Sequence, residues 1–155
     1  MRTRPLAAGL AIILIGMAGA RLASAQAMLP PTGMEDDKKP MTAEQRMQAR
    51  FPQNVRVGDL IGLPVLDESS STLGHISEVV RTPSDKIELI VAYGGFLGWG
   101  TRPIAVPIEV VGIQGREVAS LDMPPNEYAK APTWRGSNAE ALPDNATIKI
   151  ALSRR

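Results

Sequence analysis

The chain has 155 residues, with 17 Lys and Arg against 16 Asp and Glu, and therefore a formal net charge of +1. This length suits one domain with flanking segments. It contains no cysteine, which excludes disulfides, thiolate metal sites and a cysteine-linked lipid anchor. Its 14 glycines and 13 prolines, with only 4% aromatic residues, favour turns and short strands over long helices.

Residues 1–25 have the pattern of a secretory signal peptide. Arg2 and Arg4 precede an apolar run over residues 6–20, and Ala-Ser-Ala at 23–25 fits a cleavage site. The alternative is a membrane anchor, which Arg21 beside the cleavage site keeps open, although the run is shorter than the roughly 17 to 25 residues that span a bilayer. In both cases the remainder is exported, so we expect a periplasmic protein that contacts the membrane only if the segment is uncleaved.

Removal of residues 1–25 changes the sign of the net charge. Three of the 17 basic residues lie in this segment, which leaves 14 against 16 acidic ones and a net charge of −2. Nucleic-acid-binding proteins carry a clustered basic surface. We therefore expect no nucleic-acid partner.

Residues 26–53 are predicted to form a flexible linker, because they are rich in Pro, Met and charge and lack apolar periodicity. Within the linker, Thr42 and Gln45 have capping-box spacing, which predicts a short, exposed helix over residues 43–50 with too little apolar surface for the core. Four methionines recur at intervals of six or seven and offer a weaker alternative, a thioether site for copper(I): Met28, Met34, Met41 and Met47.

A barrel domain is predicted over residues 54–132. Short strand-like units cover residues 55–61, 64–67 and 73–81, and the triple serine at 69–71 is explained as turn chemistry. Residues 87–93 alternate between apolar and other side chains, as expected for a central strand.

The later units contain more proline. Residues 104–106 lie between two prolines, which predicts an edge strand or a barrel corner, and Pro107 begins a predicted helical turn. Gly115 predicts a tight hairpin over residues 113–121, where the barrel is expected to end.

The C-terminal extension is predicted over residues 133–155. Before it, Asp122 is expected to cap a short helix over residues 125–130. Within it, Trp134 is expected to pack against the barrel, and the alternation around Ile148 and Ile150 predicts a final strand.

The succession of these units resembles the PRC-barrel family. The residues that carry the resemblance are Val57-Gly58-Asp59-Leu60-Ile61-Gly62, Val65-Leu66-Asp67, Leu73-Gly74-His75-Ile76, the glycine loop 94–100, Ile104-Ala105-Val106-Pro107 and 118–121. The resemblance implies a mainly β fold, a small, strongly bent antiparallel barrel with one short helix, that serves as a docking module. It is known from the photosynthetic reaction-centre H subunit, a ribosome maturation factor and stand-alone bacterial proteins, and this chain is most similar to the exported stand-alone members.

The glycine loop carries the predicted partner-binding residues. Phe96, Leu97 and Trp99 are large apolar groups on a glycine-rich segment, with Arg102 at its rim. One interpretation is that they fold back to close the barrel. The other is an exposed patch that anchors a protein partner through Trp99.

No residue pattern indicates catalysis. His75 is the only histidine and lacks a second metal ligand, and the acidic residues are scattered without a paired site. The glycine loop leads into a strand and does not have the order of a dinucleotide-binding loop. We therefore expect no enzyme, no cofactor and no metal site, and interpret the protein as a non-catalytic adaptor that docks onto an envelope protein. The alternative is a small-ligand or metal-sensing envelope stress protein.

Overall fold

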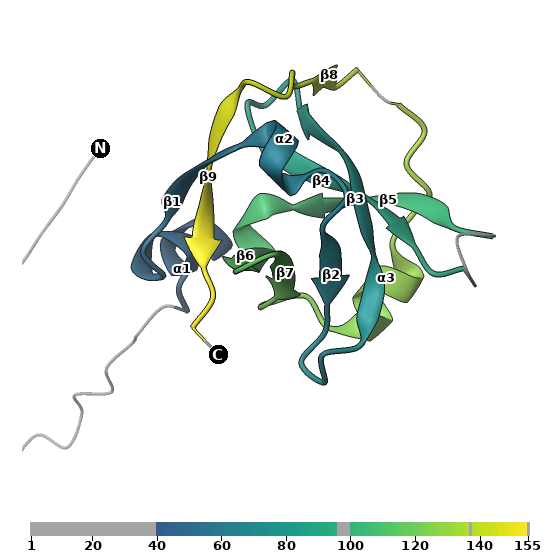
Figure 1. The fold of residues 1–155 in the computed structure, drawn as a ribbon, viewed down its shortest axis with the longest axis horizontal. Helices are drawn as coiled ribbons and strands as arrows, with labels where there is room; N and C mark the ends of the chain where they lie inside the picture. Colours follow the sequence, from purple (N-terminus) through teal and green to yellow (C-terminus); the bar gives the residue numbers. More distant parts are fainter. Residues whose placement is uncertain (1–39, 96–99, 137, 155) are drawn as a thin grey trace, which may run out of the picture. The chain divides into compact units, whose positions relative to one another are not determined.

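The computed structural model describes residues 40–95, 100–136 and 138–154. Its elements in chain order are α1 (Ala43–Ala49), β1 (Gln53–Arg56), α2 (Val57–Leu60), β2 (Pro64–Leu66), β3 (Thr72–Arg81), β4 (Ile87–Tyr93), β5 (Arg102–Pro107), the 3-10 helix η1 (Ile108–Val110), β6 (Val111–Gln114), β7 (Glu117–Ser120), α3 (Pro125–Lys130), β8 (Glu140–Ala141) and β9 (Thr147–Leu152). Figure 1 labels the α-helices and the strands. The predicted signal peptide lies outside the described residues. Among those described, no helix is long and apolar enough to cross a membrane.

The strands form one curved sheet in the order β1-β9-β6-β7-β2-β3-β4-β5, with β8 paired to β3. The mainly β fold is therefore confirmed. Most pairs are antiparallel, but β2–β7 and β6–β9 are parallel, so the sheet is not antiparallel throughout. In the described part of the chain, no hydrogen-bonded ladder joins β5 to β1. The sheet instead curls around a shared apolar core.

Strand β3 has an irregular pairing with β4. Its pairing with β4 shifts register between Ile76 and Glu78, which is a β-bulge. Gly74 in the same strand lies against the Ala92 carbonyl, where a Cβ would collide with the backbone of β4. The bulge and the close approach allow β3 and β4 to curve around the core. Strand β4 pairs with both β3 and β5, which confirms its predicted central place.

The core is drawn from almost every element. Its fully buried side chains include Leu60 of α2, Leu89 and Val91 of β4, Val106 of β5 and Val118 of β7. The predicted helical turn after Pro107 is confirmed as η1, and the hairpin is confirmed as β6–β7 with Gly115 at φ 62°. The prediction that a strand continues through Leu60 is wrong: residues 57–60 form one helical turn, which buries Val57 and Leu60 together.

Helix α1 has the predicted capping box. The Thr42 hydroxyl accepts from the Gln45 amide, and the Gln45 side chain accepts from the Thr42 amide. The prediction that this helix contributes nothing to the core is wrong, because Met47 is buried in the main apolar cluster. Helix α1 has only a narrow apolar stripe, but it packs on η1 and β9. Part of the predicted linker therefore belongs to the folded domain.

The predicted final strand is confirmed as β9, which is part of the barrel sheet. It lies between β1 and β6 and buries Ile148 and Ile150 in the core (Figure 1). The barrel therefore continues beyond β7. The prediction from the sequence that it ends there is wrong. The chain leaves the sheet through α3 and returns to it with β8 and then β9, which the local pattern of residues 113–121 does not encode.

Candidate functional site

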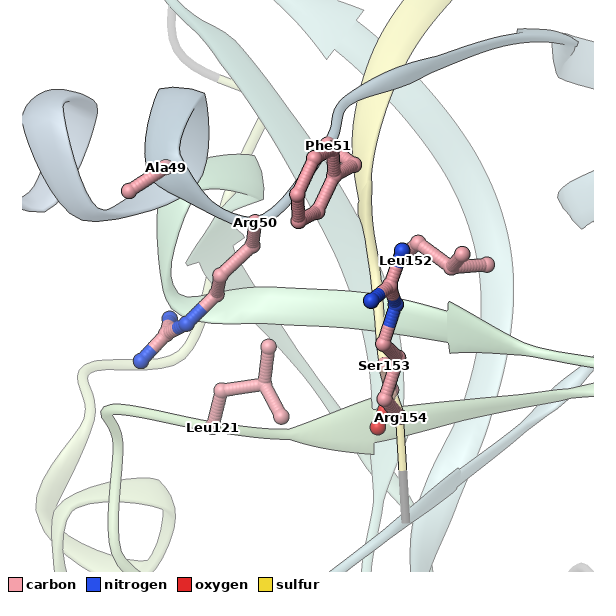
Figure 2. A pocket seen from close by; sticks show the side chains of 7 residues that line it. All are labelled: Ala49, Arg50, Phe51, Leu121, Leu152, Ser153 and Arg154. Atoms are coloured by element: carbon pink, nitrogen blue, oxygen red, sulfur yellow. The ribbon is translucent and has the colours of Figure 1, made fainter.

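An open hollow of about 330 Å³ lies where the end of α1, the turn after it, the segment after β7 and the end of β9 meet. We call it the Phe51 groove. Figure 2 shows the residues that line it: Ala49, Arg50, Phe51, Leu121, Leu152, Ser153 and Arg154. These residues come from segments far apart in the sequence. The sequence patterns do not predict this groove.

Phe51 is the most exposed large apolar side chain in the described part of the chain, at 62%. Its φ is 54°, a left-handed conformation that a bulky residue rarely adopts and that costs about 1 to 3 kcal/mol. The Arg50 carbonyl, one residue before, accepts a hydrogen bond of 3.1 Å from the Leu152 amide. This bond ties the turn to β9 and holds the strained residue in place, so the ring faces solvent from a fixed backbone.

Arg154 covers one side of the Phe51 ring. Its guanidinium carbon lies 4.4 Å from the ring centroid, a cation–π contact worth about 0.5 to 1 kcal/mol at an exposed site. Ser153 positions Arg154, because its amide donates to the Ile113 carbonyl at 2.9 Å and its hydroxyl donates to the Gln114 side chain at 3.3 Å. No acidic side chain among the described residues forms an ion pair with Arg154.

Arg50 forms the opposite wall and is fixed by Asp122. Two hydrogen bonds, of 2.6 and 2.9 Å, join its guanidinium to both carboxylate oxygens. Arg46 donates a third, of 3.1 Å, to the same carboxylate. The hydrogen bonds from Arg50, with the one from Arg46, lower the pKa of Asp122 below its ordinary value, and Asp122 raises the pKa of Arg50. Asp122 therefore does not cap α3, which begins after Pro124 without a side-chain cap.

Of the four predicted partner-binding residues, Phe96, Leu97 and Trp99 lie outside the described residues. Arg102 is described, and its guanidinium binds within the fold. It donates to the carbonyls of Tyr128 (2.9 Å), Ala129 and Ala131 at the C-terminal end of α3, and lies 5.3 Å from the Tyr93 ring centroid. Its contacts therefore hold α3 to β5.

The remaining polar residues singled out in the sequence are dispersed. His75 is exposed on β3, Asp59 pairs with Arg56 at the surface, and Asp67 accepts hydrogen bonds from two amides of the serine turn. The described ranges hold no group of three His, Asp or Glu residues placed to bind a metal ion. Trp134 is half-buried, and its amide donates to the Pro103 carbonyl, which places it beside β5 as predicted.

The two described methionines of the predicted copper(I) site do not lie on one exposed surface. Met41 is 48% exposed, whereas Met47 is buried in the core. A copper site that includes Met47 would require α1 to leave the core. Met28 and Met34 lie outside the described residues.

Comparison with known proteins identifies the domain. Residues 52–119 match the family model for the PRC-barrel domain. The chain contains a PRC-barrel domain. This confirms the predicted resemblance, and the PRC-barrel is a small β domain often involved in protein interaction. No curated protein shows significant similarity to the chain.

The Phe51 groove lies entirely outside the matched PRC-barrel residues. All seven lining residues precede residue 52 or follow residue 119. Helix α1 and strand β9 therefore add to the PRC-barrel of this chain a surface that the family model does not describe. The signals for it in the sequence are slight: an aromatic residue between a capped helix and Pro52, and an arginine after the last strand.

Proposed function

We propose that this protein is a non-catalytic docking module of the periplasm, which binds another envelope protein through the Phe51 groove beside its PRC-barrel. The observation that carries the proposal is the exposed Phe51 ring on a strained but fixed backbone. A large aromatic side chain in a preformed hollow is the usual anchor of a protein interface. Strained residues concentrate at binding sites, where the surrounding structure holds them.

The place of the groove supports the docking role. It is built on elements outside the matched domain, so it can give this chain a partner of its own. Two acidic residues, one near the groove and one on the barrel, have structural tasks: Asp122 binds two arginines and Asp67 holds a turn. The periplasmic location rests on the signal-peptide pattern of residues 1–25.

Site-specific photo-crosslinking tests this proposal. The full chain would carry a photoreactive residue at position 51, with Glu68 as an exposed control position and position 99 as a test of the glycine loop. We expect one discrete envelope protein to crosslink from position 51 and not from position 68. The purified partner should then bind the wild-type protein and lose at least about tenfold in affinity for Phe51→Gly, since anchor residues carry most of the binding energy.

Three outcomes would contradict the proposal. Capture of one protein from position 99 and not from position 51 would move the docking surface to the glycine loop. Equal binding of the captured protein to the wild type and Phe51→Gly would show that the groove is not the anchor. Recovery of the protein from the cytoplasm, and not from the periplasmic fraction, would overturn the proposed location.

A further inference from the structure

The Phe51 groove combines an apolar wall with a cation, Arg154, whose side chain donates no hydrogen bond to any described residue. Leu121, Leu152 and the Phe51 ring supply the apolar surface. The Arg154 guanidinium carbon lies over the Phe51 ring, and the side chain has no ion pair with any described residue. A guanidinium presents its N–H groups in its own plane, in a fork that matches the two oxygens of a carboxylate.

The charges around the groove favour an anionic ligand. Arg46, Arg50 and Arg154 contribute three positive charges, and Asp122 contributes one negative charge. Asp122 binds Arg50 and Arg46 together, so the cluster keeps a net positive charge beside the hollow. The Asp122 carboxylate, which like any ordinary aspartate is ionised at neutral pH, is bound to both arginines. Arg154 is therefore the cation left for a ligand.

We propose that the Phe51 groove binds an acidic protein segment: an apolar side chain packs against Phe51 and Leu152, and a neighbouring carboxylate pairs with Arg154. This inference rests on the proposed docking function and names the chemistry of the partner. A protein segment fits better than a membrane surface, because the apolar surface is a hollow with the Phe51 ring partly covered by Arg154. Binding to a lipid surface instead requires apolar side chains that project from the protein.

Peptide titration followed by NMR tests the proposal. The probes are acetyl-Gly-Asp-X-Asp-Gly-amide peptides in which X is Leu, Ile, Val, Met or Phe, and matched peptides with Asn in place of Asp. Each is titrated into the full chain labelled with nitrogen-15. We expect saturable shifts at the amides of Phe51, Leu152 and Arg154 for at least one acidic peptide, and at least about tenfold weaker binding of its Asn counterpart, as expected for one charge-assisted pair.

Matched variants locate the carboxylate contact. Arg154→Ala should weaken the acidic peptide about tenfold and leave the Asn peptide unchanged, whereas Arg154→Lys should restore part of the difference. Arg135→Ala serves as the control, because Arg135 is also exposed but does not line the groove. Unchanged far-ultraviolet circular dichroism and melting temperature would show that the variants are folded.

Each contrary result overturns a defined part of the account. Equal binding of acidic and Asn peptides at the groove would overturn the acidic class and leave the docking function standing. If no peptide binds saturably, the proposal that the groove binds an acidic protein segment is also overturned. The docking function is tested separately, by crosslinking from position 51. Binding to phosphatidylglycerol vesicles that is lost in Phe51→Gly would assign the groove to a membrane. A dimer in sedimentation that Phe51→Gly dissociates would assign it to a second copy.

Discussion

The Arg50 guanidinium binds both carboxylate oxygens of Asp122, at 2.6 and 2.9 Å, and thereby joins the end of α1 to the segment after β7. These residues are 72 positions apart in the sequence. The Asp122 side chain is only 14% exposed, so the pair is shielded more than a typical surface ion pair. The bond fixes one wall of the Phe51 groove.

Replacement of Asp122 by Asn should destabilise the protein. Asn keeps the size of the side chain but loses the charge that binds Arg50 and Arg46, so we expect the free energy of unfolding to fall by about 1 to 2 kcal/mol in urea titrations. Asp59→Asn is the matched control, because its pair with Arg56 is exposed on both sides and should change stability by less than about 0.5 kcal/mol. Equal effects of the two substitutions would contradict a special role for Asp122.

The same carboxylate should make stability depend on acid pH. The pKa of Asp122 is lowered in the folded state, chiefly by the hydrogen bond from Arg50, so its stabilisation is complete above the unfolded-state pKa and is lost as pH falls through the folded-state pKa. The difference in unfolding free energy between the wild type and Asp122→Asn should therefore be constant from about pH 7 to pH 5 and shrink below about pH 4. A difference that stays constant down to pH 3 would exclude this carboxylate as its source.

Two substitutions at position 51 should separate backbone strain from side-chain function. Glycine accepts the positive φ of this position without steric cost, whereas alanine retains the strain. Phe51→Gly and Phe51→Ala both remove the ring and its contact with Arg154. We expect the glycine variant to be more stable than the alanine variant by about 1 kcal/mol in urea unfolding. A more stable alanine variant would show that the left-handed conformation is not strained.

Arg102 should stabilise the protein by holding the C-terminal end of α3. Its guanidinium donates to three carbonyls at the end of this helix, so Arg102→Ala should lower the free energy of unfolding by about 1 to 3 kcal/mol. Arg102→Lys should recover less than half of the loss, since one ammonium cannot reproduce the fork of donors. Thermal unfolding and amide exchange of α3 measure the effect; full stability of Arg102→Ala would show that these bonds contribute nothing.

Much of the barrel could be predicted from local sequence. The alternation in β4, the prolines around β5 and the glycine of the β6–β7 turn each reflect a preference of a few neighbouring residues. The parallel pairing of β9 with β6 could not be predicted, because it depends on residues about 40 positions apart that find each other only in the folded core. The burial of Met47 could not be predicted either. One apolar residue on a polar helix gives no periodic signal, yet α1 packs on η1 and β9 in the folded protein.

The groove was harder to predict than the barrel because it depends on contacts between residues that are far apart in the sequence. Its residues come from three separate segments, and the bond from Leu152 to Arg50 that fixes Phe51 joins two of them. An exposed phenylalanine cannot be told from a buried one by sequence. Arg102 shows the converse, because a basic residue beside a glycine loop suggests an interface, whereas its donors are used by α3.

Hydrogen–deuterium exchange on the complex with the crosslinked partner tests the docking groove most directly. Exchange of the full chain would be compared with and without the purified partner, peptide by peptide. We predict slower exchange on binding in two of the segments that line the Phe51 groove, within residues 49–54 and 150–154, with no change in the β3–β4 turn. Slower exchange confined to residues 94–102, with the groove segments unchanged, would contradict the account.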